Sequence, residues 1–152
     1  MTLVELNEEK IIYGCSTRTK NANEMDPKTA KIGGIWQKFD SSVEVDYQGG
    51  ERVYGVYYNY ASDANGEFDV LAGYETQNAN LEKVTLEKGR YLVFSKSFES
   101  ADNEARIGAI IETWGKIWEY FSNEEVAYKR AYTTDFEYYK GPNEIEIHIS
   151  IA

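Results

Sequence analysis

Residues of the same type recur 78 positions apart in the two halves of this chain, and this repeat constrains the fold most. The matched pairs are Tyr13/Tyr91, Ile32/Ile110, Trp36/Trp114, Lys38/Lys116, Tyr54/Tyr132 and Tyr60/Tyr138. One residue is lost in the second hairpin, after which Phe68, Val70 and Ala72 correspond to Ile145, Ile147 and Ile149. The pattern predicts two copies of one supersecondary unit, at about residues 9–76 and 81–152.

The first copy has the pattern of a β-α-β-β unit. Strands are predicted at residues 10–18, 51–60 and 67–75, where β-branched and aromatic residues gather between turn signals. A helix is predicted from Pro27 to Phe39, with Asp26 as its N-cap.

The second copy repeats this order. A strand at 90–96 precedes a long helix that Asp102 would cap, and strands follow at 129–139 and 144–151. Strict alternation in the last strand turns four isoleucines to the core: Ile145, Ile147, Ile149 and Ile151. Their neighbours would point outward: Glu144, Glu146, His148 and Ser150. The single histidine, His148, is therefore predicted to be a solvated surface residue.

We expect residues 1–152 to form a single α+β domain. Two β-α-β-β units related by a pseudo-twofold axis would share one antiparallel sheet, with both helices on one face. A ligand cleft would lie at the seam between the units.

The amino-acid composition narrows the range of functions and locations expected for the chain. A net charge of −10 and a pI near 4.6 attract cations and argue against a nucleic-acid-binding surface, although excess acid also serves solubility. No apolar run reaches the length of a membrane span, and no signal peptide is recognisable, so a cytoplasmic location is expected. One cysteine and one histidine argue against a zinc site, and no cofactor or catalytic motif is evident. Cys15 is expected to be a small packed residue.

The aromatic residues are abundant, with 13 Tyr, 6 Phe and 3 Trp. Trp36 and Trp114 occupy equivalent helical positions. They are equally compatible with core packing and with the two walls of an aromatic slot. Packing is favoured for Trp118.

The segment at residues 132–139 holds the most informative acid. Alternation turns Thr133, Asp135, Glu137 and Tyr139 to one face. A carboxylate at Glu137 would be partly desolvated, where the first copy has the neutral Asn59. A cationic ligand could neutralise it beside aromatic faces. From spacing alone, an ordinary acid on an edge strand is the favoured interpretation.

Several segments resemble a known family. They are Thr17-Arg18-Thr19, IWQKF, YGVYYNY, VLAGYE, RYLVF, TWGKIWEYF and YTTDFEYY. Together they are similar to the GyrI-like (gyrase-inhibitor-like) family, the effector-binding domain of AraC-type and multidrug-sensing transcription regulators, from about Lys10 to Ile151.

The resemblance implies a groove between two SHS2-type repeats that binds amphipathic, cationic aromatic compounds. It places the acidic anchor at Glu137, against the interpretation from spacing, with Trp36, Tyr57, Tyr91 and Trp114 as lining. The regulators carry a helix-turn-helix for which no room is expected here, so a stand-alone module without direct nucleic-acid contact is predicted. Stand-alone relatives suggest two alternatives. One is a hydrolase of cyclopropane-bearing electrophiles in which Glu137 activates water. The other is a protein-interaction module that docks to gyrase or a regulator.

Overall fold

The computed structural model describes residues 1–99 and 102–152. Its strands are β1 (Thr2–Leu6), β2 (Lys10–Lys20), β3 (Val53–Tyr58), β4 (Glu67–Tyr74), β5 (Glu82–Leu86), β6 (Gly89–Ser97), β7 (Asp135–Gly141) and β8 (Glu144–Ser150). Its helices are α1 (Asn21–Glu24), α2 (Ile32–Ser42) and α3 (Asn103–Ser122).

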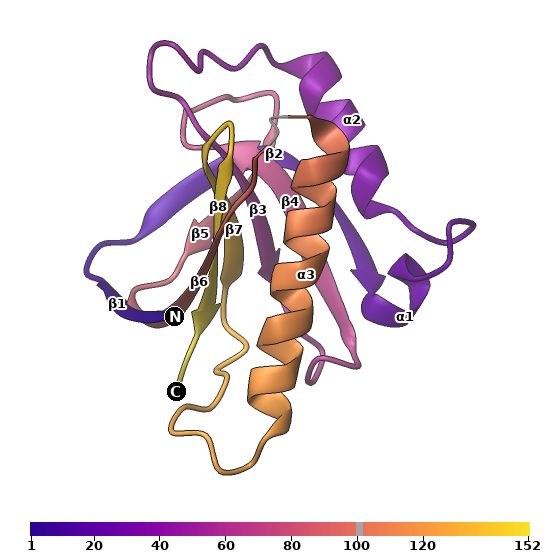
Figure 1. Cartoon of the computed structure of the whole chain (residues 1–152). Coiled ribbons are helices and arrows are strands. Elements are labelled where there is room, and N and C mark those ends of the chain that lie inside the picture. The colour runs from indigo at the N-terminus through magenta and orange to yellow at the C-terminus, as the bar shows by residue number, and fades with distance from the viewer. Residues whose placement is uncertain (100–101) are drawn as a thin grey trace.

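All eight strands form one curled antiparallel sheet in the order β1-β6-β8-β7-β3-β4-β2-β5 (Figure 1). The central pair, β7 and β3, brings together the two halves of the chain, with Gly55 opposite Glu137 and Val56 opposite Phe136. On either side of this pair the order is the same, since β8 and β6 follow β7 as β4 and β2 follow β3.

Helices α2 and α3 cover the same face of the sheet, as expected (Figure 1). Ile35 and Phe39 of α2 and Ile117 of α3 join one core cluster with Ile147 and Ile149 of β8. The predicted alternation of β8 is confirmed, because Ile145, Ile147 and Ile149 are completely buried. Cys15 is also buried in this cluster, as its packing interpretation predicted.

The opposite face of the sheet has a second core, which the sequence did not reveal. Curling brings Ile12, Leu71, Leu86 and Phe136 together on this face. The predictions that His148 and Ser150 point outward were therefore wrong. The His148 ring stacks on Phe136 at 4.3 Å between centroids, its side chain is only 13% exposed, and burial lowers its pKa to about 4. Ser150 is only 3% exposed, and its hydroxyl donates to the Asp135 carboxylate.

Helix α2 begins later than predicted. The Asp26 side chain accepts a hydrogen bond from the Lys28 backbone N–H, so this residue closes a turn instead of capping a helix. Helix α2 starts at Ile32, and no side chain of its N-cap residue bonds to it. The Glu24 carboxylate fills that role from α1, accepting the backbone N–H groups of Lys31 and Ile32. A cap that comes from another element leaves no local sequence signal.

One strand prediction needs correction, and two strands were not predicted. The segment predicted as a strand from 129 becomes regular only at Asp135, because Tyr132 has a φ of 54° and interrupts it. The unpredicted strands are β1, at one edge of the sheet, and β5, at the other edge. The helix expected after Asp102 is confirmed, since the Asp102 side chain accepts the Ala105 N–H at 2.7 Å.

Three pairs of the 78-residue repeat do not occupy equivalent places. Tyr91 lies in the second core, whereas Tyr13 lies two residues from Cys15 on the helix-covered face of β2. Tyr54 belongs to β3 and Tyr138 to β7, whereas their partners in the repeat, Tyr132 and Tyr60, lie outside any strand. A constant offset fails here because one inserted or deleted residue reverses the face on which a strand residue lies.

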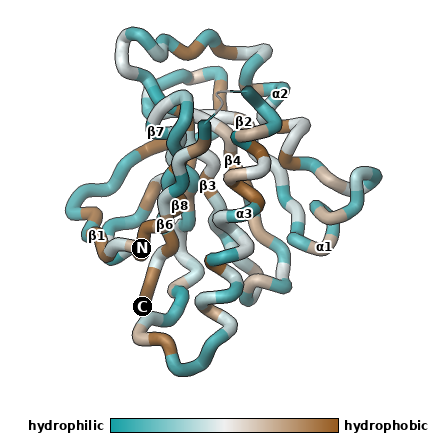
Figure 2. The backbone as a smooth tube through the Cα atoms, viewed as in Figure 1, coloured by the Kyte–Doolittle hydropathy of each residue, from teal (hydrophilic) through white to brown (hydrophobic). Residues whose placement is uncertain are grey.

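In the described part of the chain, no helix is long and apolar enough to cross a membrane. Figure 2 shows hydrophilic positions recurring along α3, the longest helix.

Candidate functional site

Glu137 lies at the centre of the sheet, in β7, with Gly55 of β3 on one side and Ile147 of β8 on the other. Only 3% of the residue is exposed. The interpretation of Glu137 as an ordinary edge-strand acid is therefore wrong. Successive residues of a strand point to opposite faces of the sheet, and Glu137 points to the face that the helices cover. Its side chain therefore meets Trp114 of α3.

Three neutral groups donate hydrogen bonds to the Glu137 carboxylate. Oε2 accepts the Tyr57 hydroxyl and the indole Nε1–H of Trp114, each at 2.8 Å. Oε1 accepts the Tyr139 hydroxyl at 2.9 Å. The donors come from β3, α3 and β7, so the site joins both halves of the chain.

Aromatic rings surround this carboxylate. Tyr57 packs edge-on against Trp114 with centroids 5.2 Å apart, and Trp36 packs edge-on against Tyr139 at 5.3 Å. Within the described residues, the hydrogen bonds to Glu137 come from Tyr57, Trp114 and Tyr139, and Trp36 contributes ring contacts. Neutral hydrogen-bond donors and aromatic rings thus surround the Glu137 carboxylate.

Burial raises the pKa of Glu137 above its ordinary value, and the three hydrogen bonds oppose that shift without cancelling it. Burial, followed by the negative charge of Glu137, raises the pKa values of Tyr57 and Tyr139 well above their ordinary value, so both phenols stay protonated donors. No Lys or Arg among the described residues forms an ion pair with Glu137. The carboxylate is thus buried without a neutralising charge.

A second buried carboxylate, Asp135, lies two residues earlier on the same face. Its Oδ2 accepts Arg130 Nη2 at 2.7 Å and the Tyr60 hydroxyl at 2.6 Å. Its Oδ1 accepts the backbone N–H and the hydroxyl of Ser150. Arg130 also lies 4.4 Å from the ring centroid of Tyr132. This carboxylate already holds a cation that the chain itself supplies.

The structure brings together four of the five residues predicted to line a site: Trp36, Tyr57, Trp114 and Glu137. Tyr91 is not among them, because it lies on the opposite face of the sheet and donates its hydroxyl to the Glu87 carbonyl. Tyr139 was not predicted as a donor, although its place two residues after Glu137 puts it on the same face of β7. Trp118 is 37% exposed beside Trp114, which contradicts its assignment to core packing.

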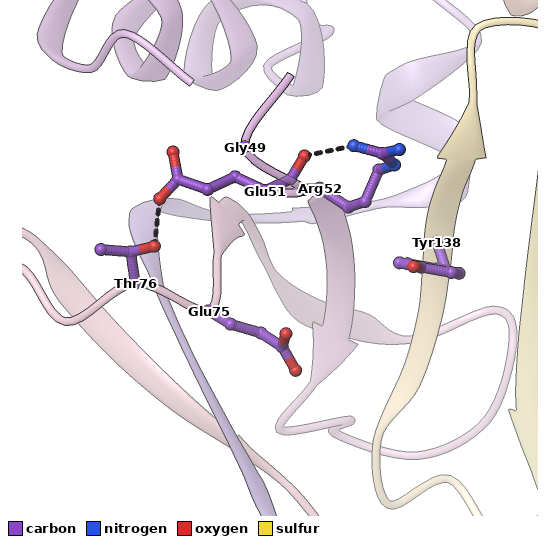
Figure 3. Close-up of a pocket in the computed structure, with 7 residues that line it drawn as sticks. Gly49, Glu51, Arg52, Glu75, Thr76 and Tyr138 are labelled. Atoms are coloured by element: carbon purple, nitrogen blue, oxygen red, sulfur yellow. Dashed lines mark hydrogen bonds between the residues drawn. The ribbon is translucent and has the colours of Figure 1, made fainter. Parts of the chain in front are cut away.

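A separate polar hollow of about 260 Å³ lies at the start of β3, and Figure 3 shows the residues that line it. Its charged groups already have partners, inside the hollow or beside it. Thr76 donates to the Glu51 carboxylate, Arg52 donates to the carbonyls of Tyr47, Glu51 and Lys140, and Glu75 pairs with Lys10. Tyr138 reaches this hollow from the face of β7 opposite to Glu137, so the two sites are distinct.

A family model described as integron-associated effector binding protein matches residues 2–151. An integron cassette protein from the mobile metagenome of Vibrio cholerae has 37% sequence identity and a TM-score of 0.84, over 99% of this chain and 95% of that one. No curated protein matches the chain at a significant level.

Two more distant structures share the fold. A putative transcription regulation protein from Staphylococcus aureus MU50 has 17% identity and a TM-score of 0.65, over 99% of this chain and 96% of its own. The protein SAV2435, solved bound to tetraphenylphosphonium, has 16% identity and a TM-score of 0.61, over 99% of this chain and 93% of its own. These two structures show the fold alone, and the family model confirms the effector-binding part of the predicted resemblance. Because the family model spans nearly the whole sequence, the chain belongs to the family of integron-associated effector-binding proteins.

Proposed function

We propose that this protein binds amphipathic organic cations, with Glu137 as the charged anchor and Trp36, Tyr57, Trp114 and Tyr139 as the aromatic surround. The observation that carries the proposal is the state of Glu137. Its carboxylate is buried and hydrogen-bonded by neutral donors alone, although desolvating an unpaired charge is costly. A cation stacked against these rings would neutralise the carboxylate and gain cation–π contact.

Two further facts support this ligand class. The net charge of −10 raises the local concentration of cations around the molecule. SAV2435, which has the same fold, was solved with tetraphenylphosphonium, a lipophilic cation with four phenyl rings. A family of effector-binding proteins is expected to bind a small molecule rather than a polymer.

The test is calorimetric titration of tetraphenylphosphonium into the wild type and Glu137→Gln, with neutral triphenylphosphine oxide as the comparator. We expect Glu137→Gln to weaken binding of the cation at least about tenfold, and to leave the neutral compound unaffected. Glu146→Gln is the matched control, because Glu146 lies on the opposite face of the neighbouring strand. Equal affinity of wild type and Glu137→Gln for the cation would refute the proposal.

The geometry also supports a second candidate, hydrolysis of a strained cyclopropane-bearing electrophile. Burial raises the pKa of Glu137 toward the range of a general base, and the Tyr57 hydroxyl lies 2.8 Å from its carboxylate. Chromatography of such an electrophile after incubation with the protein would separate the two functions. Product that forms with the wild type and not with Glu137→Gln would favour hydrolysis, and unchanged substrate would favour binding alone.

We further infer that residues 1–152 form one ligand-binding unit built by duplication of a β-α-β-β element. The matching strand order on both sides of the β7–β3 pair supports this inference. Val70 and Ile147 correspond in the predicted repeat, and they lie opposite Tyr57 and Glu137, respectively. In this correspondence Glu137 stands where the first copy has Tyr57, not Asn59 as the constant offset of 78 predicts. Tyr57 also donates a hydrogen bond to Glu137.

A further inference from the structure

We propose that Gly55 is a positioning residue of the cation site, because its missing side chain provides the space in which the Glu137 carboxylate and the Trp36 indole lie. The inference rests on the proposed function of Glu137. Gly55 lies opposite Glu137 across the central strand pair, and it is buried in the middle of β3.

The space above Gly55 is taken by side chains of the site. A Cβ at this position would lie 2.7 Å from Glu137 Oε1 and 3.3 Å from Trp36 Cζ2. The first distance is shorter than real Cβ contacts, so even alanine would force the carboxylate to move. The displaced oxygen is the one that accepts the Tyr139 hydroxyl.

The backbone offers no other reason for glycine at this position. Positive φ values are found at Gly50 and Gly89, whereas Gly55 has the ordinary extended conformation of a strand. A glycine inside a strand weakens the strand, because it adds backbone entropy and packs no side chain. The gain that offsets this cost is therefore the room for the carboxylate and the indole.

Another glycine pair shows what a purely structural role looks like. Gly14 and Gly73 lie opposite each other in β2 and β4. A Cβ at either position would collide with backbone atoms of the neighbouring strand, namely the Ala72 and Tyr13 carbonyls. Those glycines let two strands approach, whereas a Cβ at Gly55 would meet functional side chains.

The test compares Gly55→Ala with Gly141→Ala, a glycine of β7 where an added Cβ has open space. Tetraphenylphosphonium affinity is measured by calorimetry, and the Trp114 indole N–H resonance is followed by NMR in the free protein. We expect Gly55→Ala to weaken binding about tenfold and to shift the Trp114 resonance, because the carboxylate that accepts this proton moves. Gly141→Ala should change neither quantity.

A rescue variant separates steric displacement from general damage. Glu137→Asp shortens the acid by one methylene group and makes room for a Cβ at position 55. We expect the double variant Gly55→Ala/Glu137→Asp to bind more tightly than the two single effects combined would predict. If Gly55→Ala does not fold, the same double variant should restore folding, because the collision is with Glu137.

The outcomes distinguish this inference from the proposed function. Wild-type binding that depends on Glu137, together with unchanged affinity and an unchanged Trp114 resonance in Gly55→Ala, overturns the role of Gly55 alone. If the wild type does not bind the cation, the proposed function fails, and the Trp114 resonance still decides whether Gly55 positions the carboxylate. A folding defect that the double variant does not relieve also overturns the inference.

Discussion

Asp135 and Glu137 are two buried carboxylates on the same face of one strand, yet their surroundings differ in one respect. Asp135 is paired with Arg130, whose side chain is 6% exposed, whereas Glu137 is bonded to a tryptophan and two tyrosines. The first carboxylate is neutralised from within the chain, so it can hold the irregular segment before β7 against the sheet. Under the proposed function, the charge of the second is neutralised by the ligand. The comparison suggests that a missing internal cation marks a ligand site better than burial of an acid does.

The largest effect is expected from Asp135→Asn. The change leaves the Arg130 guanidinium buried without its counter-charge, which costs about 3–5 kcal/mol of unfolding free energy. Urea unfolding followed by circular dichroism would measure the loss. A stability within 1 kcal/mol of the wild type would break the comparison, because Asp135 would then not be the structural acid of the two.

Glu137→Gln should act in the opposite direction on stability. Because the pKa of Glu137 is raised in the folded state, the folded protein holds its proton to a higher pH than the unfolded chain does. Wild-type stability should therefore fall as the pH rises from the ordinary value of 4.5 through the folded pKa, and the variant should lack this fall. Urea unfolding of both proteins across this pH range tests the sign.

The same protonation should control ligand affinity. A cation needs the ionised carboxylate, so tetraphenylphosphonium affinity in the wild type should rise with pH through the folded pKa of Glu137. Calorimetric titrations at several pH values would show it. An affinity independent of pH would mean that Glu137 is already ionised throughout, and that the site is less desolvated than its burial indicates.

A smaller effect is expected from Tyr139→Phe, which removes one of the three hydrogen bonds that orient Glu137. Loss of one bond to a charged group should weaken cation binding by about 1.5–3 kcal/mol at most. Tyr138→Phe is the matched control, since Tyr138 lies on the other face of β7. Similar losses in the two variants would indicate a general effect of tyrosine in this strand.

The smallest effect is expected from Asp69→Asn. Asp69 pairs with Arg18 at 3.1 Å, but the two side chains are 25% and 41% exposed. An ion pair that water screens contributes about 0–1 kcal/mol, so the variant should unfold nearly as the wild type does. Comparing Asp69→Asn with Asp135→Asn in the same urea titration separates two free-energy costs. One is the cost of leaving a buried charge unpaired, and the other is the cost of losing an exposed ion pair.

Local patterns predicted much of the fold, and long-range contacts account for what they missed. The alternation of Ile145, Ile147 and Ile149 and the cap at Asp102 are encoded within a few residues, and both are confirmed. The start of α2 depends on Glu24, and the burial of His148 depends on the curl of the whole sheet. Neither can be read from neighbouring residues.

The site was predictable in part for the same reason. Strand alternation placed Asp135, Glu137 and Tyr139 on one face, and the family resemblance selected Glu137 among the acids. The resemblance also assigned Tyr91 to the lining, but its place in β6 puts it on the opposite face of the sheet, in the second core. The importance of Gly55 follows only from its place opposite Glu137, a pairing between the two halves that neither half contains alone.

The tryptophans give the molecule an optical property that follows from their placement. The indoles of Trp114 and Trp118 lie 6.0 Å apart at an angle of 32°, one bonded to the Glu137 carboxylate and the other 37% exposed. Two chromophores so close couple their electronic transitions, and one of them donates a hydrogen bond to Glu137, the proposed anchor. Near-ultraviolet circular dichroism therefore includes a contribution from an indole bonded to Glu137, without any added label.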